Sequence, residues 1–388
     1  MRTTYDTIVI GCGGIGSAAL YWLALRLGGD VLGIEQFDLG HPWGGSQDHS
    51  RIIRLMYHDA RYTALTPHTY TAWAQAEEES GVELVLKTGG VEIAAPAYHH
   101  DLARYAAAMD AASIPYARFG ADELRRRYPQ FAVKDDVQVI YQEAGGLVNA
   151  AKGNAVHIAL ARAHGATILT GCAVHGLRPQ ADSVRVLTAQ GDFNCRRVVV
   201  AAASWTNSVI GSTGFSIPLT VTQEQVTYYA TSQLKQFAPG RFPIFIWKDE
   251  LDIYGFPVYG EVATKAGIDA SGPVVTPATR SMTPSAENER QLTGWLQTHI
   301  PGFAGPVLYS KTCLYDMPPD REFIIDHLPE HPQIHICVGA GHAYKFASLL
   351  GKILSELAVD GHTNYPITGF GFNRPAIMDP AFERTFHI

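Results

Sequence analysis

The chain has 388 residues, of which 46% are hydrophobic, 10% aromatic and 17% charged. This length suits about two domains, and the composition is that of an ordinary globular protein, which excludes disordered and fibrous classes. A formal charge of −7 with a pI near 6.1 argues against nucleic acid or an anionic membrane surface as the main partner. No apolar run approaches the ~18 residues that a membrane span needs.

Cysteine usage and the two ends of the chain bear on its compartment. Five cysteines, widely spaced and without a CxxC pair, predict neither a disulfide framework nor a zinc site, so we expect no metal. The first residues lead almost directly into a strand without a signal segment, and the C-terminal Phe386-His387-Ile388 is not a peroxisomal address. We therefore expect a cytoplasmic protein.

The first strand is followed at once by a glycine-rich turn. Residues 5–10 form a short run rich in β-branched residues, and the turn Gly11-Cys12-Gly13-Gly14-Ile15-Gly16 then opens into an apolar helical stretch. A second strand over residues 31–34 ends at Glu35. This order of strand, turn, helix, strand and acid is typical of a Rossmann nucleotide-binding unit.

Each residue type in this turn has its own physical reason. Gly11 permits the tight turn, Gly13 lets a pyrophosphate approach the backbone, and Gly16 lets the helix pack on the strand. The helix N-terminus offers N–H donors and partial positive charge to the diphosphate. Glu35 accepts the ribose hydroxyls and would repel a 2′-phosphate. The pattern does not choose FAD over NAD. The predicted dinucleotide contacts are Gly11, Gly13, Gly14, Ile15, Gly16 and Glu35.

The remaining elements alternate between helices and strands. Pro67 is expected at the first position of a helix that runs to Ser80. Further helices are predicted over 101–112, 122–128, 151–165, 285–299 and 347–357. Strands are predicted within 82–94 and over 167–169, 184–187, 198–203, 323–326 and 334–338.

Several further motifs follow the glycine turn in a fixed order. They are Gly45-Ser46, Ser50-Arg51-Ile52-Ile53-Arg54, Tyr254-Gly255-Phe256-Pro257 ahead of Lys265, Cys313-Leu314-Tyr315 with Pro319-Asp320, Phe323-Ile324-Ile325-Asp326, and Gly341-His342-Ala343-Tyr344-Lys345-Phe346. Together with the turn and Glu35, they resemble the monomeric sarcosine oxidase and N-methyltryptophan oxidase family, within the D-amino-acid-oxidase-like flavoenzymes. The resemblance covers nearly the whole chain.

The resemblance implies a cofactor and a reaction. The cofactor is FAD, joined by a thioether from Cys313 to the 8-methyl group of the flavin. The reaction oxidises a secondary amine of an amino acid to an imine, which water hydrolyses to an amine and an aldehyde. Oxygen then reoxidises the flavin and leaves as hydrogen peroxide. The implied partners are a small amino-acid substrate and O2, and the implied state is a monomer.

The resemblance also implies roles for individual residues. Arg54 clamps the substrate carboxylate through a bidentate fork, with Lys345 as the second cation. Lys265 activates oxygen by stabilising superoxide as it forms. Tyr254 lines the substrate pocket, and Arg51 lies beside the flavin. The other implied cofactor contacts are Ser46, Val174, Gly341 and His342, and Lys345 is among them as well.

The same residues have plainer interpretations. Cys313 by type alone is a small buried hydrophobe, and its attack on the flavin requires a lowered thiol pKa. Arg51 and Arg54 by type alone are two surface cations, and Lys265 is a surface lysine. Tyr254 by type alone is a core residue with a polar tip. Their joint occurrence in the motifs favours the catalytic interpretation.

The chain departs from the family pattern where the substrate binds. Asp269 replaces a histidine four residues after the lysine, and Gln47 and Asp48 replace a histidine pair before the arginine motif. Because Asp48 and Asp269 are acidic, we expect the enzyme to prefer a substrate whose amine carries a cationic or differently shaped substituent. His49 is a candidate base nearby.

Three other functions compete with the amine oxidase. A related dehydrogenase would pass electrons to a carrier instead of oxygen. A biosynthetic flavoenzyme would oxidise a cyclic imino acid or another N-substituted amino acid. A non-catalytic FAD-binding protein would have no reason to keep Arg54, Lys265 and Lys345 together.

The expected fold class is α/β with two interleaved domains. One is a Rossmann-type FAD-binding domain and the other is a mainly antiparallel substrate-binding sheet. The segments 1–80, 150–215 and 313–388 are expected in the first domain, and the segments 81–149 and 216–312 in the second.

Overall fold

The computed structural model describes residues 2–386, which form two large sheets and a small one. The first large sheet has eight strands and a parallel centre in the order β9-β2-β1-β12-β20. An antiparallel strand extends one edge beyond β20, and a β10-β11 hairpin pairs with the first half of β12. Its strands are β1 (Thr4–Ile10), β2 (Val31–Ile34), β9 (Thr167–Leu169), β10 (Val174–Pro179), β11 (Val184–Thr188), β12 (Phe193–Val200), β19 (Ile324–Leu328) and β20 (His331–Val338).

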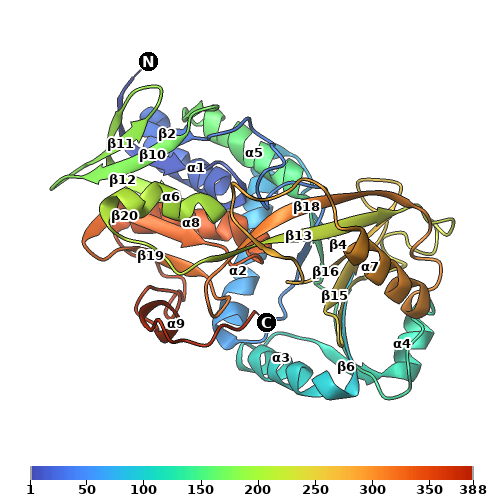
Figure 1. Cartoon of the computed structure of the whole chain (residues 1–388). Coiled ribbons are helices and arrows are strands. Elements are labelled where there is room, and N and C mark those ends of the chain that lie inside the picture. The colour runs from blue at the N-terminus through green and yellow to red at the C-terminus, as the bar shows by residue number, and fades with distance from the viewer. Residues whose placement is uncertain (1, 387–388) are drawn as a thin grey trace.

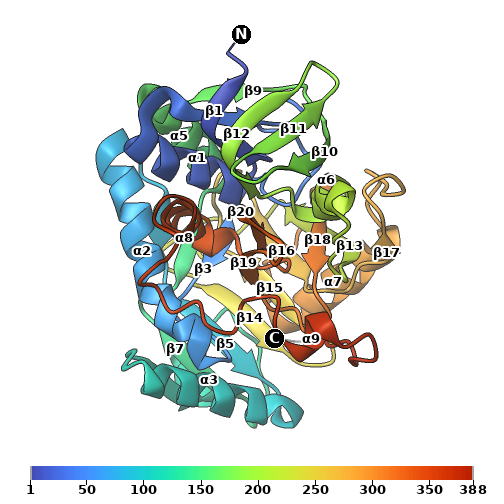
Figure 2. The same cartoon turned by 90° about the vertical axis from the view of Figure 1, so that its left-hand side faces the viewer.

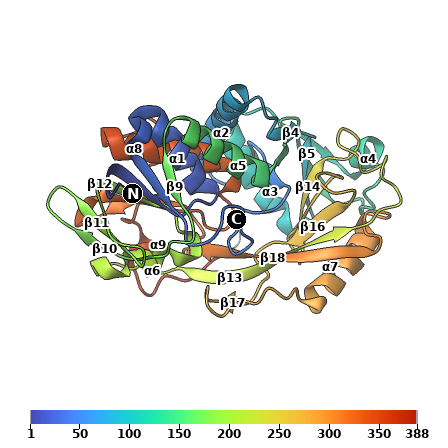
Figure 3. The ribbon, with the colours of Figure 1, turned by 90° about the horizontal axis from the view of Figure 1, so that it is seen from above.

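Helices cover one face of this sheet, as Figure 3 shows from above. They are α1 (Gly14–Leu27), α5 (Ala150–Ala163) and α8 (Ala347–Asp360), and α2 (Ala60–Ser80) packs against α5 and α8. α1 packs between α5 and α8, and ten of its residues, from Gly14 to Ala24, are buried. Two apolar clusters take alternate residues of the central strands, so the centre of the sheet is buried on both faces, which explains its continuous apolar strands.

The predicted start of α2 is wrong. The helix begins at Ala60, where Asp59 caps it by accepting a hydrogen bond from the backbone N–H of Arg61 at 2.8 Å. Pro67 therefore lies inside the helix, where it removes a backbone donor. The hydroxyl of Thr66 donates to the carbonyl of Thr63 at 3.2 Å and satisfies the acceptor that Pro67 leaves open.

The second large sheet has nine strands and is mainly antiparallel, except that β5 pairs in parallel with β14. On one face α4 (Ala121–Arg127) and α7 (Ala286–His299) close an aromatic core, and α3 (His99–Ala111) covers part of the other. The strands are β5 (Gly90–Ala94), β6 (Ala117–Gly120), β7 (Gln138–Gln142), β13 (Thr220–Tyr229), β14 (Ile244–Lys248), β15 (Ile253–Phe256), β16 (Thr264–Ile268), β17 (Val274–Val275) and β18 (Val307–Met317).

Three connections join the two halves. A small sheet of β3 (Arg51–Ile53), β4 (Val85–Lys87) and β8 (Gly146–Val148) lies between them. α2 runs from α1 down to α3 along one side in Figure 2. The long strands β13 and β18 cross the molecule toward α7 in Figure 1 and pair with each other.

The predicted fold class is confirmed, with a Rossmann-like sheet beside a mainly antiparallel one. The division into five segments stays a prediction. Residue 313 lies inside β18, so the chain passes the predicted boundary there along an unbroken strand. The predicted strand 198–203 ends at Val200, because Ala203 takes a left-handed turn with φ of +47°. No helix among residues 2–386 has both the length and the apolar character to cross a membrane.

Candidate active site

A single cavity of about 980 Å³ connects the glycine turn to the second large sheet. This volume is at the upper end of the range for small-molecule and cofactor sites. Its walls come from the start of α1, the segment 39–54, α5, β16 and β18, and the turn after β20. Fifteen of the sixteen predicted site residues lie on this wall, and the exception is Gly16 behind the turn.

The glycine turn has the conformation that the sequence requires. Gly11 has a φ of +89°, and a Cβ there would lie 2.5 Å from the carbonyl oxygen of Ala201. A Cβ on Gly16 would overlap the carbonyl oxygen of Gly11. The N-terminus of α1 has no side-chain cap and no acidic residue in its first turn, so its N–H groups suit a diphosphate.

Replacing Gly16 by alanine is expected to abolish flavin binding, because the added methyl group has no room against Gly11. Gly294→Ala is the matched control, since nothing lies within 4 Å of a Cβ at that position in α7. That control is expected to keep its flavin and gain about 0.5–1 kcal/mol in stability. Flavin absorbance per protein and thermal unfolding measure the two effects. A yellow Gly16→Ala protein would contradict the assignment of the turn.

Glu35 closes the nucleotide end of the cavity from the end of β2. Its two carboxylate oxygens accept hydrogen bonds from the backbone N–H groups of Cys12 at 2.8 Å and Phe37 at 3.1 Å. Burial alone would raise the pKa of Glu35, but hydrogen bonds from His41 and these two N–H groups outweigh burial and lower the pKa. Glu35 is therefore ionised, as an acceptor of ribose hydroxyls has to be.

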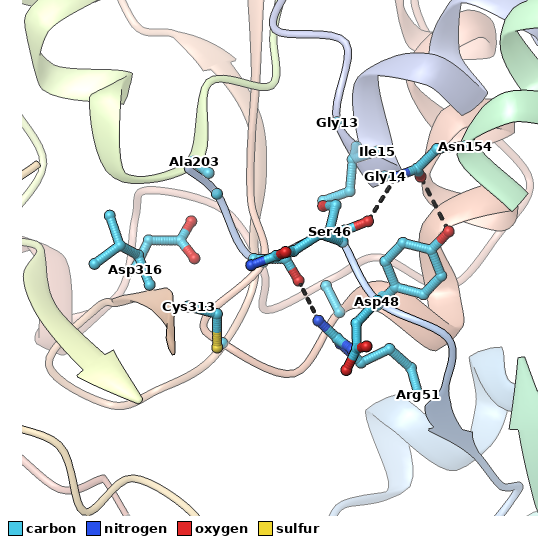
Figure 4. A pocket seen from close by; sticks show the side chains of 18 of the residues that line it. Gly13, Gly14, Ile15, Ser46, Asp48, Arg51, Asn154, Ala203, Cys313 and Asp316 are labelled. Atoms are coloured by element: carbon cyan, nitrogen blue, oxygen red, sulfur yellow. Dashed lines mark hydrogen bonds and ion pairs between the residues drawn. The ribbon is translucent and has the colours of Figure 1, made fainter. Parts of the chain in front are cut away.

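The segment before β3 passes over the middle of the cavity. The carbonyl of Ser46 accepts a hydrogen bond from Asn154 on α5 at 2.6 Å, and Tyr344 in turn donates to Asn154 at 3.0 Å. Arg51 donates to the carbonyls of Ser50 and Gly45 at 2.9 and 2.8 Å. Figure 4 shows this network beside the Gly13–Ile15 turn, with Cys313 across the cavity.

Cys313 lies on β18, partly buried, and lines the cavity between Arg51 and Tyr254. Burial raises the pKa of its thiol to about 11, although Arg51 and Lys265 act in the opposite direction. The protein alone therefore does not supply the lowered pKa that attack on the flavin requires. The nearby cations, Arg51, Lys265 and Arg280, do not compensate for the loss of water around the thiolate.

Lys265 is buried in β16, at the cavity wall near Cys313. Its ammonium nitrogen forms an ion pair with Asp48 at 2.7 Å and donates to the carbonyl and hydroxyl oxygens of Ser50 at 2.8 and 3.2 Å. Burial lowers the pKa of Lys265 to about 8, against the opposite effect of Asp48. The surface-lysine interpretation is thus excluded.

Arg54, which lines the cavity, forms a buried ion pair with Glu92. The side chain of Arg54 is 6% exposed and that of Glu92 is fully buried. Arg54 lines the cavity, and its Nε donor has no hydrogen-bond acceptor among the described residues. This geometry excludes the interpretation of Arg54 as a surface cation. Its Nε–H can still donate a hydrogen bond to an incoming carboxylate.

Tyr57 brings Lys345 next to Arg54. The ammonium of Lys345 donates to the hydroxyl of Tyr57 at 3.0 Å and to the carbonyl of His342 at 2.9 Å, while the guanidinium of Arg54 lies 5.1 Å from the centre of the Tyr57 ring. Burial, and then the charge of Arg54, hold the pKa of Lys345 well below its usual value. An anion between the two side chains would reverse this effect.

His342 anchors the same network from the turn after β20. Its Nδ1 is 3.0 Å from the hydroxyl of Tyr57, and its Nε2 is 3.0 Å from the carbonyl of Arg321. Burial, with the charge of Lys345, holds the imidazole pKa well below its usual value. The ring is neutral. Its Nε2–H therefore donates a hydrogen bond to the backbone carbonyl of Arg321, and its Nδ1 accepts one from the hydroxyl of Tyr57.

The structure reveals two charged pairs that sequence reasoning did not assign. Asp269 receives two hydrogen bonds from Arg321, at 2.9 and 3.0 Å, and Lys248 lies 3.5 Å from Asp252. All four side chains line the cavity near Tyr254. The available signal was a charged residue next to an apolar run, as with Lys248 at the end of β14.

The expected preference for a cationic substrate group is not supported by these contacts. Asp269 is neutralised by Arg321, and Asp48 faces Lys265 and Lys311 instead of the substrate end. Gln47 donates to the backbone carbonyls of Pro42 and Thr312. The ring of His49 is 3.1 Å from Glu261.

Val174, Tyr254 and Gly341, three other residues predicted at the site, also line the cavity. Val174 begins β10 at a bulge beside the nucleotide end, and Tyr254 lines the wall from β15. Gly341 has a φ of +78°, and a Cβ there would lie 2.5 Å from the ring of Tyr315. The turn after β20 therefore needs glycine for two reasons, its backbone angle and this close approach.

Comparison with known proteins identifies the class of this fold and site. Residues 6–357 match the family of FAD dependent oxidoreductases, to which the chain therefore belongs. It is 32% identical to the monomeric sarcosine oxidase of Streptomyces avermitilis, over 97% of this chain and 99% of that protein. It is 28% identical to the N-methyl-L-tryptophan oxidase of Escherichia coli, over 95% of this chain and 99% of that one. The resemblance predicted from the motifs is confirmed, and the chain is an FAD-dependent amine oxidase by class.

A solved structure gives the same result for the fold. NikD, described as an unusual amino acid oxidase essential for nikkomycin biosynthesis, superimposes with a TM-score of 0.83 at 26% identity, over 95% of this chain and 98% of that one. The residues present fit an FAD. The N-terminus of α1 has backbone N–H groups without a side-chain cap, Glu35 is ionised, and the cavity reaches from both of them to Cys313.

Proposed function

We propose that this enzyme oxidises a secondary amino acid, one that carries a substituent on its amine nitrogen, to an imine, and that oxygen is its electron acceptor. The observation that carries the proposal is the shared wall of one cavity. That wall holds the nucleotide turn, Cys313, Lys265, and the Arg54 and Lys345 pair. Each of these groups serves a separate step of such a reaction.

The substrate carboxylate binds between Arg54 and Lys345 in this proposal. Tyr57 holds both cations, so a carboxylate that bridges them has a fixed orientation. Bound FAD supplies the acceptor for two electrons and the hydrogen from the carbon next to the amine nitrogen. The resulting imine leaves the site and is hydrolysed by water to an amine and an aldehyde, which for sarcosine would be glycine and formaldehyde.

The charges around the cavity favour a neutral substrate amine. Four basic residues, Arg54, Lys248, Arg321 and Lys345, line the substrate end, against three acids, which are Asp252, Asp269 and the Glu92 that pairs with Arg54. This excess of positive charge lowers the pKa of an amine bound there and attracts the carboxylate. Only the neutral nitrogen has the lone pair that the imine bond needs.

A test of this function screens purified holoenzyme against secondary amino acids, including cyclic imino acids, for hydrogen peroxide and aldehyde release. An N-methyl amino acid is expected to give equal amounts of both. Flavin reduction without peroxide would favour a dehydrogenase. Peroxide without aldehyde from a cyclic substrate would favour the biosynthetic alternative, because a ring imine does not lose its substituent.

We also propose that Cys313 bears the flavin through a thioether. Formation of the link replaces one hydrogen of the 8-methyl group by sulfur, and the two electrons and two protons released end on oxygen as hydrogen peroxide. The thiolate is the reacting form. Because the thiol pKa lies near 11, little thiolate exists at neutral pH.

The rate of flavin attachment is therefore expected to rise about tenfold per pH unit between neutrality and pH 9. Apoprotein is mixed with FAD at each pH, and the colour that stays with acid-precipitated protein is measured over time. Cys313→Ser is expected to bind FAD and release all of it into the acid supernatant. A rate of attachment that does not change with pH would contradict the role of thiol ionisation. If acid precipitation released the flavin from the parent protein, the thioether would be refuted.

A monomer and a cytoplasmic location complete the proposal. The relatives named monomeric sarcosine oxidase support the first. Light scattering on the holoenzyme is expected to give a mass near 42.2 kDa.

A further inference from the structure

Asp48 has a backbone conformation that few side chains adopt. Its φ is +93°, in the region that favours glycine. The residue is 7% exposed and lies in the segment that crosses the cavity, beside Arg51 in Figure 4. An aspartate kept at such a position costs free energy of folding, and residues of this kind concentrate at functional sites.

The carboxylate of Asp48 is surrounded by cations and a hydroxyl. Oδ2 lies 2.7 Å from the ammonium of Lys265 and 3.8 Å from the guanidinium of Arg51. Oδ1 accepts a hydrogen bond from Tyr228 at 2.6 Å and another from Lys311 at 3.2 Å. Burial alone would raise the pKa of Asp48, but Lys265 and Arg51 outweigh it and lower the pKa, so the carboxylate is charged.

Lys265 depends on this carboxylate for its charge. Its other two oxygen contacts, both from Ser50, are neutral, and the ring of Phe256 lies 4.7 Å away on β15. A buried ammonium without a counter-ion loses its proton more readily. The charged and titratable groups that act on Lys265 are Asp48, Arg51, Cys313 and the ring of Tyr228, and among residues 2–386 Asp48 is the only carboxylate that pairs with it.

We propose that Asp48 is a positioning residue for oxygen reduction, which holds Lys265 protonated at the cavity wall and so sets the pH range in which the reduced enzyme reacts with oxygen. This inference rests on the proposed function, in which Lys265 serves the oxygen step. Oxygen takes up two electrons and two protons and leaves as hydrogen peroxide. Negative charge develops on it before the protons arrive, and a protonated Lys265 stabilises that charge.

The test compares Asp48→Asn and Asp48→Gly with the parent holoenzyme. Asparagine keeps the side-chain volume, and glycine suits the backbone angle, so the second variant guards against misfolding. Each protein is reduced without oxygen and mixed with oxygenated buffer over a series of pH values. The parent rate is expected to fall as pH rises through about 8, since the ammonium then loses its proton. In both variants this midpoint is expected about one pH unit lower or more.

A second readout does not depend on turnover. The visible spectrum of the oxidised flavin is titrated without substrate or oxygen, because loss of a nearby charge shifts its bands. In both Asp48 variants the pH midpoint of this spectral change is expected to be lower than in the parent by the same amount as the midpoint of the reoxidation rate. Glu261→Gln is the matched control, since Glu261 is a neighbouring acid that contacts His49 and Tyr309 and lies off the cavity wall. Its midpoint is expected to equal that of the parent.

The outcomes separate the two proposals. Unchanged midpoints in both Asp48 variants, with a Lys265→Met variant that reoxidises slowly, would overturn the role of Asp48 alone. A Lys265→Met variant as fast as the parent would instead overturn the oxygen step on which the inference rests.

Discussion

Replacing Arg54 by methionine is expected to lower kcat/KM for the best secondary amino acid by about two to three orders of magnitude. Truncation of one partner in a buried, hydrogen-bonded charge pair costs about 2–5 kcal/mol, and every ~1.4 kcal/mol is tenfold. The loss falls on the substrate carboxylate, which then has Lys345 alone. Steady-state peroxide release and anaerobic flavin reduction both measure it.

The same substitution is expected to destabilise the fold. Glu92 is fully buried, and removal of Arg54 leaves its charge uncompensated at a cost of about 3–5 kcal/mol. The double variant Arg54→Met/Glu92→Gln therefore serves as the control, since it removes both charges. It is expected to regain most of the stability, by thermal unfolding, and none of the turnover. If the double variant recovered turnover, the role of Arg54 would be only to pair with Glu92 in the fold.

Replacing Lys265 by methionine is expected to slow reoxidation by oxygen about 100- to 1,000-fold, the usual cost of removing one preorganised group that stabilises developing charge. Reduction of the flavin by substrate without oxygen is expected to stay within a few-fold of the parent rate, because Lys265 contacts Asp48 and Ser50, whereas Arg54 and Lys345 contact Glu92 and Tyr57. Stopped-flow absorbance separates the two half-reactions in one protein. Equal loss in both would show that the substitution disturbs the site as a whole.

The nucleotide half of the fold was predictable because its signals are local. The glycine turn, the following helix and Glu35 lie within one continuous stretch, and each residue type there has a steric or electrostatic reason. The start of α2 was not predictable in the same way. Pro67 indicated a helix start, whereas the cap at Asp59 and the hydroxyl of Thr66 allow the helix to continue through it.

The charges of the site were the least predictable part. Asp269 and Asp48 indicated extra negative charge at the amine, but their partners Arg321 and Lys265 lie 52 and 217 residues away along the chain, and only the fold brings them together. The thiol pKa of Cys313 had the same difficulty. The sequence shows the thiol, while the burial that raises its pKa despite Arg51 and Lys265 depends on three-dimensional packing.

The order of strands in the first large sheet has a consequence for biosynthesis. The glycine turn leaves the ribosome first, but β20, which pairs with β12, and α8, which packs on α1, end at residues 338 and 360. A nascent chain that stops short of them has the diphosphate turn without the sheet edge and helix that support it. The complete nucleotide site is therefore expected to form only after nearly the whole chain has been translated.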